Sequence, residues 1–322
     1  MHFFSRFQKE LGIENIIGVD NFLLGRPEWI STLTEKSTSL KVHAMDITDA
    51  NMEKIPEAEK ADIIIHMASI ASPTFYRKYP LETVDANIWG LRKLLDYYKN
   101  KSVRGFLFFS SSEIYGDPAP ECIPINEEYR GNVSTMGPRA CYDEAKRFGE
   151  TLCHIFSEQF ELPITIARPF NNYGPGMHLG DKRVPADFAR AIFSNQDIEI
   201  FSDGSPTRTF CYISDAITGY LKVLAYPKFD YFNIGIDRPE ISIETLAQIF
   251  AANGKKVFNY SGKVLFNSPP EKDYLTHNPN RRCPKIEKAR KLLSYSPAIV
   301  VENGVYRFLK FLKLGDGKLC FL

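Results

Sequence analysis

The sequence predicts an α/β protein built on a doubly wound parallel sheet, with a smaller α/β lobe toward the C-terminus. Short, nearly continuous apolar runs alternate with helix-forming segments in the first half of the chain, a pattern typical of parallel strands covered on both faces. Past residue 175 the elements become shorter, with more proline and glycine. We therefore expect one domain over residues 1–175 and a second lobe over residues 176–322, with some elements interleaved.

The individual elements follow from this alternation. The strand-like runs are "NIIGVD", "KVHAMD", "DIIIHMA", "GFLFFSS" and "PITIARP", and helix-forming segments follow them. Alternating strands and helices favour right-handed crossover units and therefore a parallel sheet. The expected strands are 15–20, 41–46, 62–68, 105–111 and 163–169, and the expected helices are 81–99, 140–160, 184–195, 214–226, 242–253 and 285–294.

Composition excludes several classes of protein. The 322 residues are 44% hydrophobic, enough to bury a large core, and 40 basic against 39 acidic residues leave a net charge of +1. We therefore expect no nucleic-acid partner. No apolar run reaches the ~18 residues of a membrane span, so no membrane partner is expected. The cysteines lack CxxC or zinc spacing, which predicts reduced thiols, a cytoplasmic location and no metal. They are Cys122, Cys141, Cys153, Cys211, Cys283 and Cys320.

Polar and small residues follow the expected strands at their carboxyl ends, where ligands bind in this fold class. Asp20 ends the first strand, where an acid can bond ribose hydroxyls, although a role as a turn or helix-capping residue is equally compatible with its position. Asp46 ends the next strand. Ala68 and Ser69 are small residues that a cofactor could approach closely, and the run from Ser110 to Glu113 resembles the rim of an active site more than a core.

The segment "GPRACYDEAKRFGETL" places Tyr142 and Lys146 four residues apart. On a helix these two side chains lie on the same face. An ammonium group beside a tyrosine favours the phenolate, so the pair could be catalytic. A surface tyrosine next to a solvated lysine is the alternative, and the spacing alone does not exclude it.

Five motifs in order identify a family resemblance: "SSSEIYGD", "YDEAK", "RPFNNYGP", "TRTFCYISD" and "RRCPKIEKARKLL". This series resembles the extended short-chain dehydrogenase/reductases, and more narrowly the NAD-dependent nucleotide-sugar epimerases, dehydratases and decarboxylases, which have a Rossmann-like fold. "GPRACYDEAKR" and "SSSEIYGDP" are most similar to the UDP-glucuronate decarboxylase branch. The resemblance extends over about residues 15–310.

The resemblance implies a role for each matching residue. Ser111 would bond the reacting sugar hydroxyl, Tyr142 would remove its proton, and Lys146 would lower the pKa of the tyrosine, which is near ~10 in a free side chain. NAD is the implied cofactor and a UDP-sugar the implied substrate. The implied cofactor-binding residues are Asp20, Asn21, Asp46, Ile47, Ala68, Ser69, Asn87, Tyr142 and Lys146, and the implied substrate-binding residues are Ser112, Asn171, Arg183, Val184, Arg208 and Arg282.

Glu113 helps to choose among the reactions of the family. Dehydratases resemble one another in carrying an Asp-Glu pair here, whereas this chain has Ser112 before Glu113, as the decarboxylases do. Serine cannot act as the acid of a dehydration at neutral pH, and a simple 4-epimerase needs no extra acid. We therefore expect UDP-glucuronate decarboxylation to UDP-xylose, with Glu113 counted among the catalytic residues. A 4,6-dehydratase and a 4-epimerase are the alternatives.

Three departures from the family pattern matter. Gly176 stands where the family has arginine, and Lys285 stands in place of an acid, so the substrate pocket could differ. Only Gly12 and Gly18 precede Asp20, which leaves no GxxGxxG loop to hold the cofactor pyrophosphate. "FFSRFQKELG" is read as the family's first helix, so its first strand and glycine loop are expected to be missing. An inactive relative that acts as a binding subunit is therefore the alternative to an enzyme.

A homodimer is also expected. Family members resemble one another in pairing through two helices of each subunit, and segments 81–99 and 140–160 match these helices. The second segment carries more apolar residues than one helix needs to cover a sheet. These are Leu152, Ile155, Phe156 and Phe160.

Overall fold

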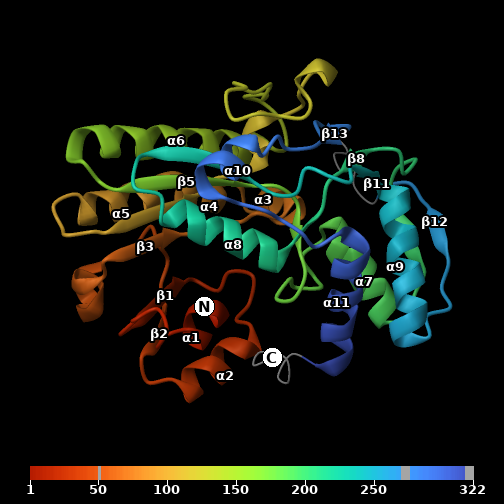
Figure 1. The fold of residues 1–322 in the computed structure, drawn as a ribbon, viewed down its shortest axis with the longest axis horizontal. Coiled ribbons are helices and arrows are strands. Elements are labelled where there is room, and N and C mark those ends of the chain that lie inside the picture. The colour runs from red at the N-terminus through yellow and green to blue at the C-terminus, as the bar shows by residue number, and fades with distance from the viewer. Residues whose placement is uncertain (50–51, 270–275, 316–322) are drawn as a thin grey trace.

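The computed structural model of the protein describes residues 1–49, 52–269 and 276–315, and its centre is a four-stranded parallel sheet in the order β10-β5-β4-β3 (Figure 1). Residues at the C-terminal tail, including Cys320, lie outside the described part. The register pairs Ile64 with Phe106 and Phe106 with Ile164. The strands are β3 (Ile63–His66), β4 (Gly105–Phe109), β5 (Ile164–Pro169) and β10 (Asp230–Ile234).

Helices cover both faces of this sheet, which explains why its strands are nearly continuous in apolar residues. Successive side chains of a strand point to opposite faces. In β4, Phe106 and Phe108 pack with helices α5 (Leu91–Tyr98) and α6 (Ala140–Phe160). Leu107 points to the opposite face and packs in a second core with helices α8 (Ile213–Leu224) and α10 (Glu287–Leu293).

A second, two-stranded parallel sheet joins β1 (Ile16–Asp20) to β2 (Leu40–Ala44). Across the described ranges, no strand is hydrogen-bonded to the other edge of β1 or to the outer edge of β3. The helix expected at "FFSRFQKELG" is shorter than predicted, because α1 spans only His2–Arg6. The missing first strand stays a prediction. Helix α2 (Glu28–Lys36) connects β1 to β2.

The helix expected at 81–99 consists of three consecutive helical parts. Helix α4 (Pro80–Asp85) continues into one π-helical segment, η3 (Ala86–Gly90), and then into α5. Gly90 lies where a Cβ would stand 2.4 Å from Cγ2 of Ile47, so the loop after β2 packs directly on this helix. The π turn carries Asn87, which is fully buried. Single π turns of this kind often occur at functional sites.

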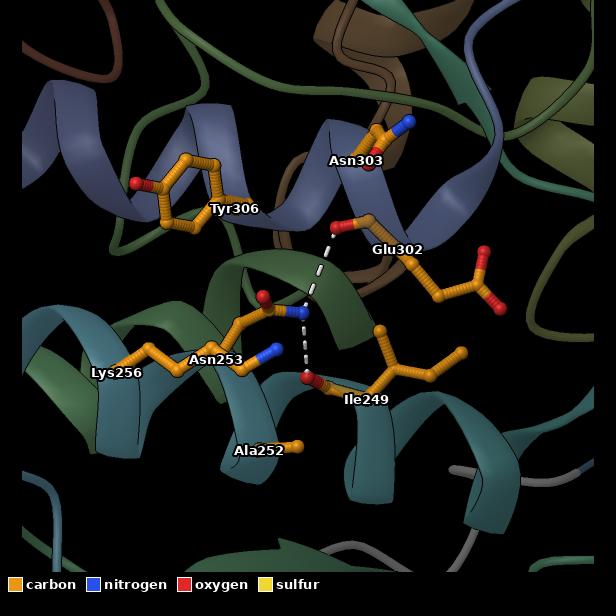
Figure 2. Close-up of a pocket in the computed structure, with 7 residues that line it drawn as sticks. All are labelled: Ile249, Ala252, Asn253, Lys256, Glu302, Asn303 and Tyr306. Carbon is orange, nitrogen blue, oxygen red and sulfur yellow. Dashed lines mark hydrogen bonds between the residues drawn. The ribbon is translucent and has the colours of Figure 1, made fainter.

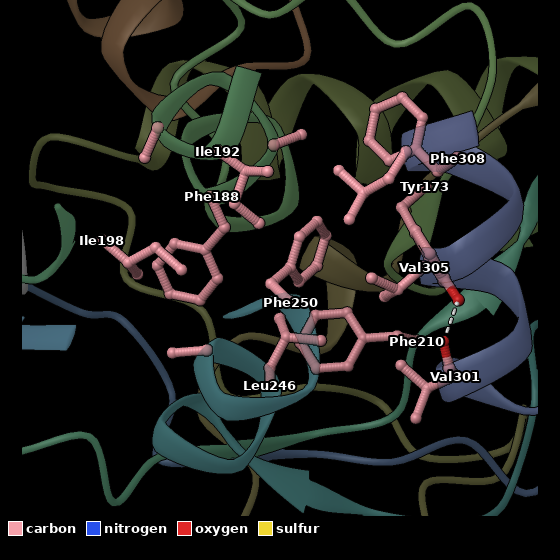
Figure 3. Packing of buried hydrophobic residues seen from close by; sticks show 14 of the residues in the cluster. Tyr173, Phe188, Ile192, Ile198, Phe210, Leu246, Phe250, Val301, Val305 and Phe308 are labelled. Carbon is pink, nitrogen blue, oxygen red and sulfur yellow. Dashed lines mark hydrogen bonds between the residues drawn. The ribbon is translucent and has the colours of Figure 1, made fainter. Parts of the chain in front are cut away.

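The second lobe has a core of its own, formed by helices α7 (Val184–Phe193), α9 (Ile243–Phe258) and α11 (Val301–Leu314) (Figure 3). Phe188, Phe250 and Phe308 pack at its centre. Strand β10 belongs to the main sheet and helix α8 packs against it, although both follow residue 176. The chain therefore returns to the first domain. The division at residue 175 stays a prediction.

Short elements complete the fold. No described helix is both long enough and apolar enough to cross a membrane. The short helices are α3 (Pro73–Lys78), η1 (Met52–Lys54), η2 (Pro56–Lys60), η4 (Ser112–Tyr115) and η5 (Pro120–Cys122). The short strands are β6 (Asn172–Tyr173), β7 (Ile198–Ile200), β8 (Thr207–Arg208), β9 (Cys211–Tyr212), β11 (Ile241–Ser242), β12 (Val264–Phe266) and β13 (Arg281–Arg282).

Candidate active site

Ser111 and Tyr142 meet just beyond the carboxyl end of β4. Ser111 precedes η4, and its hydroxyl oxygen accepts a hydrogen bond of 3.2 Å from the Glu113 amide. Tyr142 lies in the first turn of α6 and is 4% exposed. Because strand β4 and helix α6 pack against each other, two segments thirty residues apart place both hydroxyl groups in one buried site. The alternative of a surface tyrosine is excluded by this burial.

Burial sets the protonation of the Tyr142–Lys146 pair. It raises the pKa of Tyr142 to about 12, while the Ser111 hydroxyl and the charge of Arg183 act to lower it. Burial also lowers the pKa of Lys146 to about 7. The Lys146 ammonium donates to the Phe109 carbonyl at 2.6 Å and lies 5.7 Å from the Tyr142 ring centroid. The expected lowering of the tyrosine pKa by Lys146 stays a prediction.

Glu113 is held between two arginines. Arg282 donates to it with both terminal nitrogens, at 2.8 Å for Nη2 to Oε2, and Nη2 of Arg139 contacts the same Oε2. Burial acts to raise the pKa of Glu113, but Arg139 and Arg282 outweigh it and hold the pKa of the carboxyl far below its usual range. Glu113 is therefore an ionised carboxylate in this arrangement.

The strand register of the second lobe places two predicted arginines side by side. β8 and β13 run parallel, and Arg208 pairs with Arg282. Nη1 of Arg208 donates to the carbonyls of Thr207 at 2.7 Å and Asn280 at 3.0 Å, and Nη2 contacts the Pro279 carbonyl. Burial, together with the nearby positive charge of Arg282, lowers the pKa of Arg208 to about 9. Arg208 thus also orders the backbone leading into β13.

Three residues that the sequence analysis missed complete the cluster, namely Arg139, Asp143 and Tyr76. Asp143 is 5% exposed, and its Oδ2 lies 3.8 Å from Nε of Arg139. Tyr76 stacks on Tyr142 with ring centroids 5.2 Å apart and planes at 12°. The Arg139–Asp143 pair has helical i,i+4 spacing inside a motif already recognised, which is a signal that the sequence offered. Nothing in the sequence placed Tyr76 near it.

The remaining predicted substrate-binding residues lie in η4, after β5 and at the start of α7. Ser112 is buried in η4, and Asn171 takes a positive φ of 43° and donates to the Thr209 carbonyl at 3.0 Å. Arg183 precedes α7, pairs with Asp181 at 2.8 Å and influences the Tyr142 pKa, so it lies by the phenol. Val184 packs against the core of the lobe. Gly176 is exposed with φ of 90°.

The residues predicted for the adenosine end of the cofactor form one polar group after β1 and β2. Asn21 donates to Oδ2 of Asp46 at 2.6 Å, and Oδ1 of Asp46 accepts from the Thr48 amide at 2.8 Å. Oδ1 of Asp20 accepts from the Phe22 amide at 2.7 Å. Asp20 therefore caps a turn, as the alternative interpretation expected, and it remains exposed at the strand end.

At the nicotinamide end, buried polar atoms without a partner fit a bound cofactor. Nδ2 of Asn87 donates to the Ser69 hydroxyl at 3.0 Å, whereas Oδ1 of Asn87 and the Ser110 hydroxyl find no partner within the described ranges of the chain. Ala68 and Ser69 are partly exposed at the end of β3. A buried polar atom is costly to leave unpaired, so a ligand that bonds these atoms would stabilise the site. No cluster of His, Cys, Asp or Glu in the described residues suits a metal ion.

A separate depression of about 480 Å³ lies between α9 and α11 (Figure 2). Asn253 crosses it by donating to the carbonyls of Ile249 at 3.0 Å and Glu302 at 3.4 Å. None of the predicted site residues lines it, so it does not belong to the candidate active site.

A model of the NAD dependent epimerase/dehydratase family matches residues 3–235. The chain belongs to this family. The predicted family and the α/β fold with a parallel sheet are thereby confirmed, and so is NAD, the cofactor of the family.

Curated relatives include UDP-glucuronic acid decarboxylase 1 of Xenopus tropicalis, 33% identical over 299 residues, and UDP-glucuronic acid decarboxylase 6 of Arabidopsis thaliana, 34% identical over 246 residues. These alignments cover 92% and 76% of this chain and 65% and 68% of the relatives. The chain thus spans less than two thirds of the Xenopus protein.

Solved structures are similar in fold. UDP-glucose 4-epimerase of Thermotoga maritima, with UDP-glucose, has a TM-score of 0.81 at 22% identity, covering 96% of this chain and 95% of that one. The dTDP-glucose 4,6-dehydratase of Bacillus anthracis, with NAD, has a TM-score of 0.77 at 15% identity, covering 96% and 91%. At these identities the likeness shows the fold alone.

Proposed function

We propose that the protein modifies a nucleotide sugar through a 4-keto intermediate, and that the reaction is the decarboxylation of UDP-glucuronate to UDP-xylose. The observation that carries this proposal is Glu113 bound between Arg139 and Arg282, beside Ser111 and Tyr142. Guanidinium forks suit carboxylates, and glucuronate carries its carboxylate on the carbon next to the reacting C4. The names of the curated relatives support the same reaction.

In the proposed mechanism Tyr142 removes the proton of the sugar 4-hydroxyl while Ser111 bonds that hydroxyl. NAD, when bound, supplies the acceptor for the C4 hydride and later returns it. The 4-keto sugar is a β-keto acid, so the C5–C6 bond breaks, carbon dioxide leaves, and the bond's electron pair forms an enolate. A proton from solvent then takes the place of the lost carboxyl group at C5, and Tyr142 gives its proton back to the C4 oxygen when the hydride is returned to C4. Asp20, Asn21, Asp46, Ile47, Ala68, Ser69 and Asn87, with Tyr142 and Lys146, are the residues proposed to hold the cofactor.

Because its pKa is high, Tyr142 needs nearby positive charges before it can act as a base. At a pKa of about 12 the phenol is protonated at neutral pH, so the phenolate must be favoured by nearby cations. Arg183 already acts in this direction, and Lys146 lies one helical turn away. In the proposed site, Lys146 stabilises the phenolate and bonds the ribose of the cofactor.

Dehydration and C4 epimerisation are the alternative reactions, and a binding subunit is the alternative to an enzyme. Ser112, which is no acid at neutral pH, counts against dehydration. The two-stranded sheet of β1 and β2, separate from the main sheet, favours the binding subunit, because this fold class normally binds its cofactor across the carboxyl ends of one continuous sheet.

The test is to offer UDP-glucuronate, UDP-N-acetylglucosamine and dTDP-glucose, each with NAD. We expect carbon dioxide and a UDP-pentose from the first. Glu113→Gln is expected to slow the steps after oxidation, so that a 4-keto sugar accumulates, whereas the exposed Glu121→Gln serves as the matched control. A 4-keto-6-deoxy sugar would identify a dehydratase, and C4 inversion an epimerase. Nucleotide-sugar binding without turnover would identify a binding subunit.

A further inference from the structure

Arg139 bridges two buried carboxyl groups. It stands directly before α6, is 5% exposed, and contacts Oε2 of Glu113 with Nη2 while its Nε lies 3.8 Å from Oδ2 of Asp143. The other carboxyl oxygen of Asp143, Oδ1, is buried without a partner among the described residues. Asp143 therefore keeps one unpaired acceptor atom, while its other oxygen lies near the guanidinium group that contacts Glu113.

The same arginine also connects Glu113 to Tyr142 through an aromatic ring. The guanidinium carbon of Arg139 lies 5.8 Å from the ring centroid of Tyr76, and Tyr76 stacks on Tyr142. Tyr76 is 1% exposed, so its contacts with Arg139 and with Tyr142 are shielded from water. The position of Arg139 thus fixes Glu113 relative to the proposed base.

A substrate carboxylate bound at this site would change the number of cationic partners that Glu113 keeps. In the structure Glu113 has two cationic partners, Arg139 and Arg282. An incoming carboxylate competes for Arg282, which leaves Glu113 dependent on Arg139 alone. If Arg139 also turned to the substrate carboxylate, Glu113 would have no cationic partner in a site largely removed from water. Leaving a carboxylate unpaired there costs free energy.

We propose that Asp143 is a positioning residue that anchors Arg139, so that Arg139 retains Glu113 when a substrate carboxylate occupies Arg282. The inference rests on the proposed function, because it assumes an acidic sugar. Glu113 and burial both raise the pKa of Asp143, to about 8, whereas Arg139 and Arg282 lower it. Asp143 therefore changes from neutral to negatively charged just above neutral pH. Its interaction with the Arg139 guanidinium group becomes stronger at the same time. The groups facing it are Glu113, Arg139, Glu144, Arg282, Tyr76, Cys141 and Tyr142.

The kinetic test compares Asp143→Asn with Glu144→Gln, its partly exposed neighbour on α6. We expect Asp143→Asn to lower kcat about 10- to 100-fold, because the ion pair between Asp143 and Arg139 would be lost, with KM changed far less. The ionisation above neutral pH should vanish from its pH profile. Arg139→Lys should resemble it, and the double variant should be no worse than either single variant. If the fold-losses in kcat of the two single variants multiplied in the double variant, the inference would be overturned. An unchanged kcat in Asp143→Asn would also overturn it.

A second measurement needs no substrate. Difference infrared spectroscopy of the wild-type protein should show a buried protonated carboxyl band that disappears as the pH rises above neutral, and Glu144→Gln should retain it. In Glu113→Gln the midpoint should fall, because the charge that raises the Asp143 pKa is gone. An unshifted midpoint would overturn the inference. If these shifts occur but UDP-glucuronate is not decarboxylated, the proposed reaction fails while the anchoring of Arg139 stands.

Discussion

At the scale of single residues, burial controls the chemistry of the site. Tyr142, Lys146 and Glu113 are all held in an environment that penalises charge, yet they respond in different ways. Tyr142 and Lys146 shift toward their neutral forms because neither has a strong ionic partner. Glu113 stays charged because Arg139 and Arg282 compensate it. The site therefore combines a weak base that needs activation with a carboxylate that is already fixed.

Tyr142→Phe tests the base. The substitution keeps the ring that stacks on Tyr76 and removes only the hydroxyl, so the thermal unfolding midpoint should change little. Turnover of the nucleotide sugar should fall ~10²- to 10⁴-fold, the usual contribution of a general base. Tyr306→Phe, on the outer face of α11, is the control for loss of a phenolic hydroxyl. Near-normal turnover in Tyr142→Phe would assign the base to another group.

At the scale of elements, the helices that position the site also present an apolar outer face. Leu152 and Phe156 of α6 turn inward to the main core, so these two of the four expected interface residues cover the sheet instead. Ile155 and Phe160 are exposed, and so is Phe148. On the neighbouring helical run, Leu81 is 73% and Trp89 59% exposed. Helix α4 and segment η3 pack against α6, and we infer that these exposed side chains belong to one surface.

We expect this surface to form the homodimer. Trp89→Glu combined with Phe148→Glu should convert a dimer into a monomer, because two charges would be buried in an apolar interface. Sedimentation velocity at micromolar concentration measures the result. Leu292→Glu, at a similarly exposed apolar position on α10, should leave the dimer intact. A wild-type protein that sediments as a monomer would refute this prediction.

At the scale of the whole molecule, strands β1 to β5 and β10 form two separate parallel sheets. β4 and β5 are each paired on both sides, whereas β1 and β2 pair only with each other within the described ranges. The side chains of β1 and β2 are also less buried than those of β4. Strand β1 packs against the main core through Ile17 and Val19. The adenosine end of the predicted cofactor site thus lies on the less supported part.

Hydrogen exchange can measure this difference. Amides of β1 and β2 should exchange much faster than those of β4 and β5, since a strand pair without further partners opens more easily. Added NAD should slow exchange at residues 16–21 and 44–48 if Asp20, Asn21 and Asp46 hold its adenosine end. Equal protection of both sheets would contradict the first expectation. NAD that changes no exchange rate would favour the binding subunit.

The sequence by itself determined the order of strands and helices, the family and the residues of the Ser111–Tyr142–Lys146 set. Periodicity and motif spacing are local properties, so they are readable along the chain. Only the tertiary structure placed Arg208 beside Arg282, brought Tyr76 onto Tyr142, turned Leu152 and Phe156 into the core, and returned β10 to the first sheet. The arginine, tyrosine and strand pairs each join segments more than sixty residues apart. Their partners depend on strand register and helix packing, which no local pattern encodes.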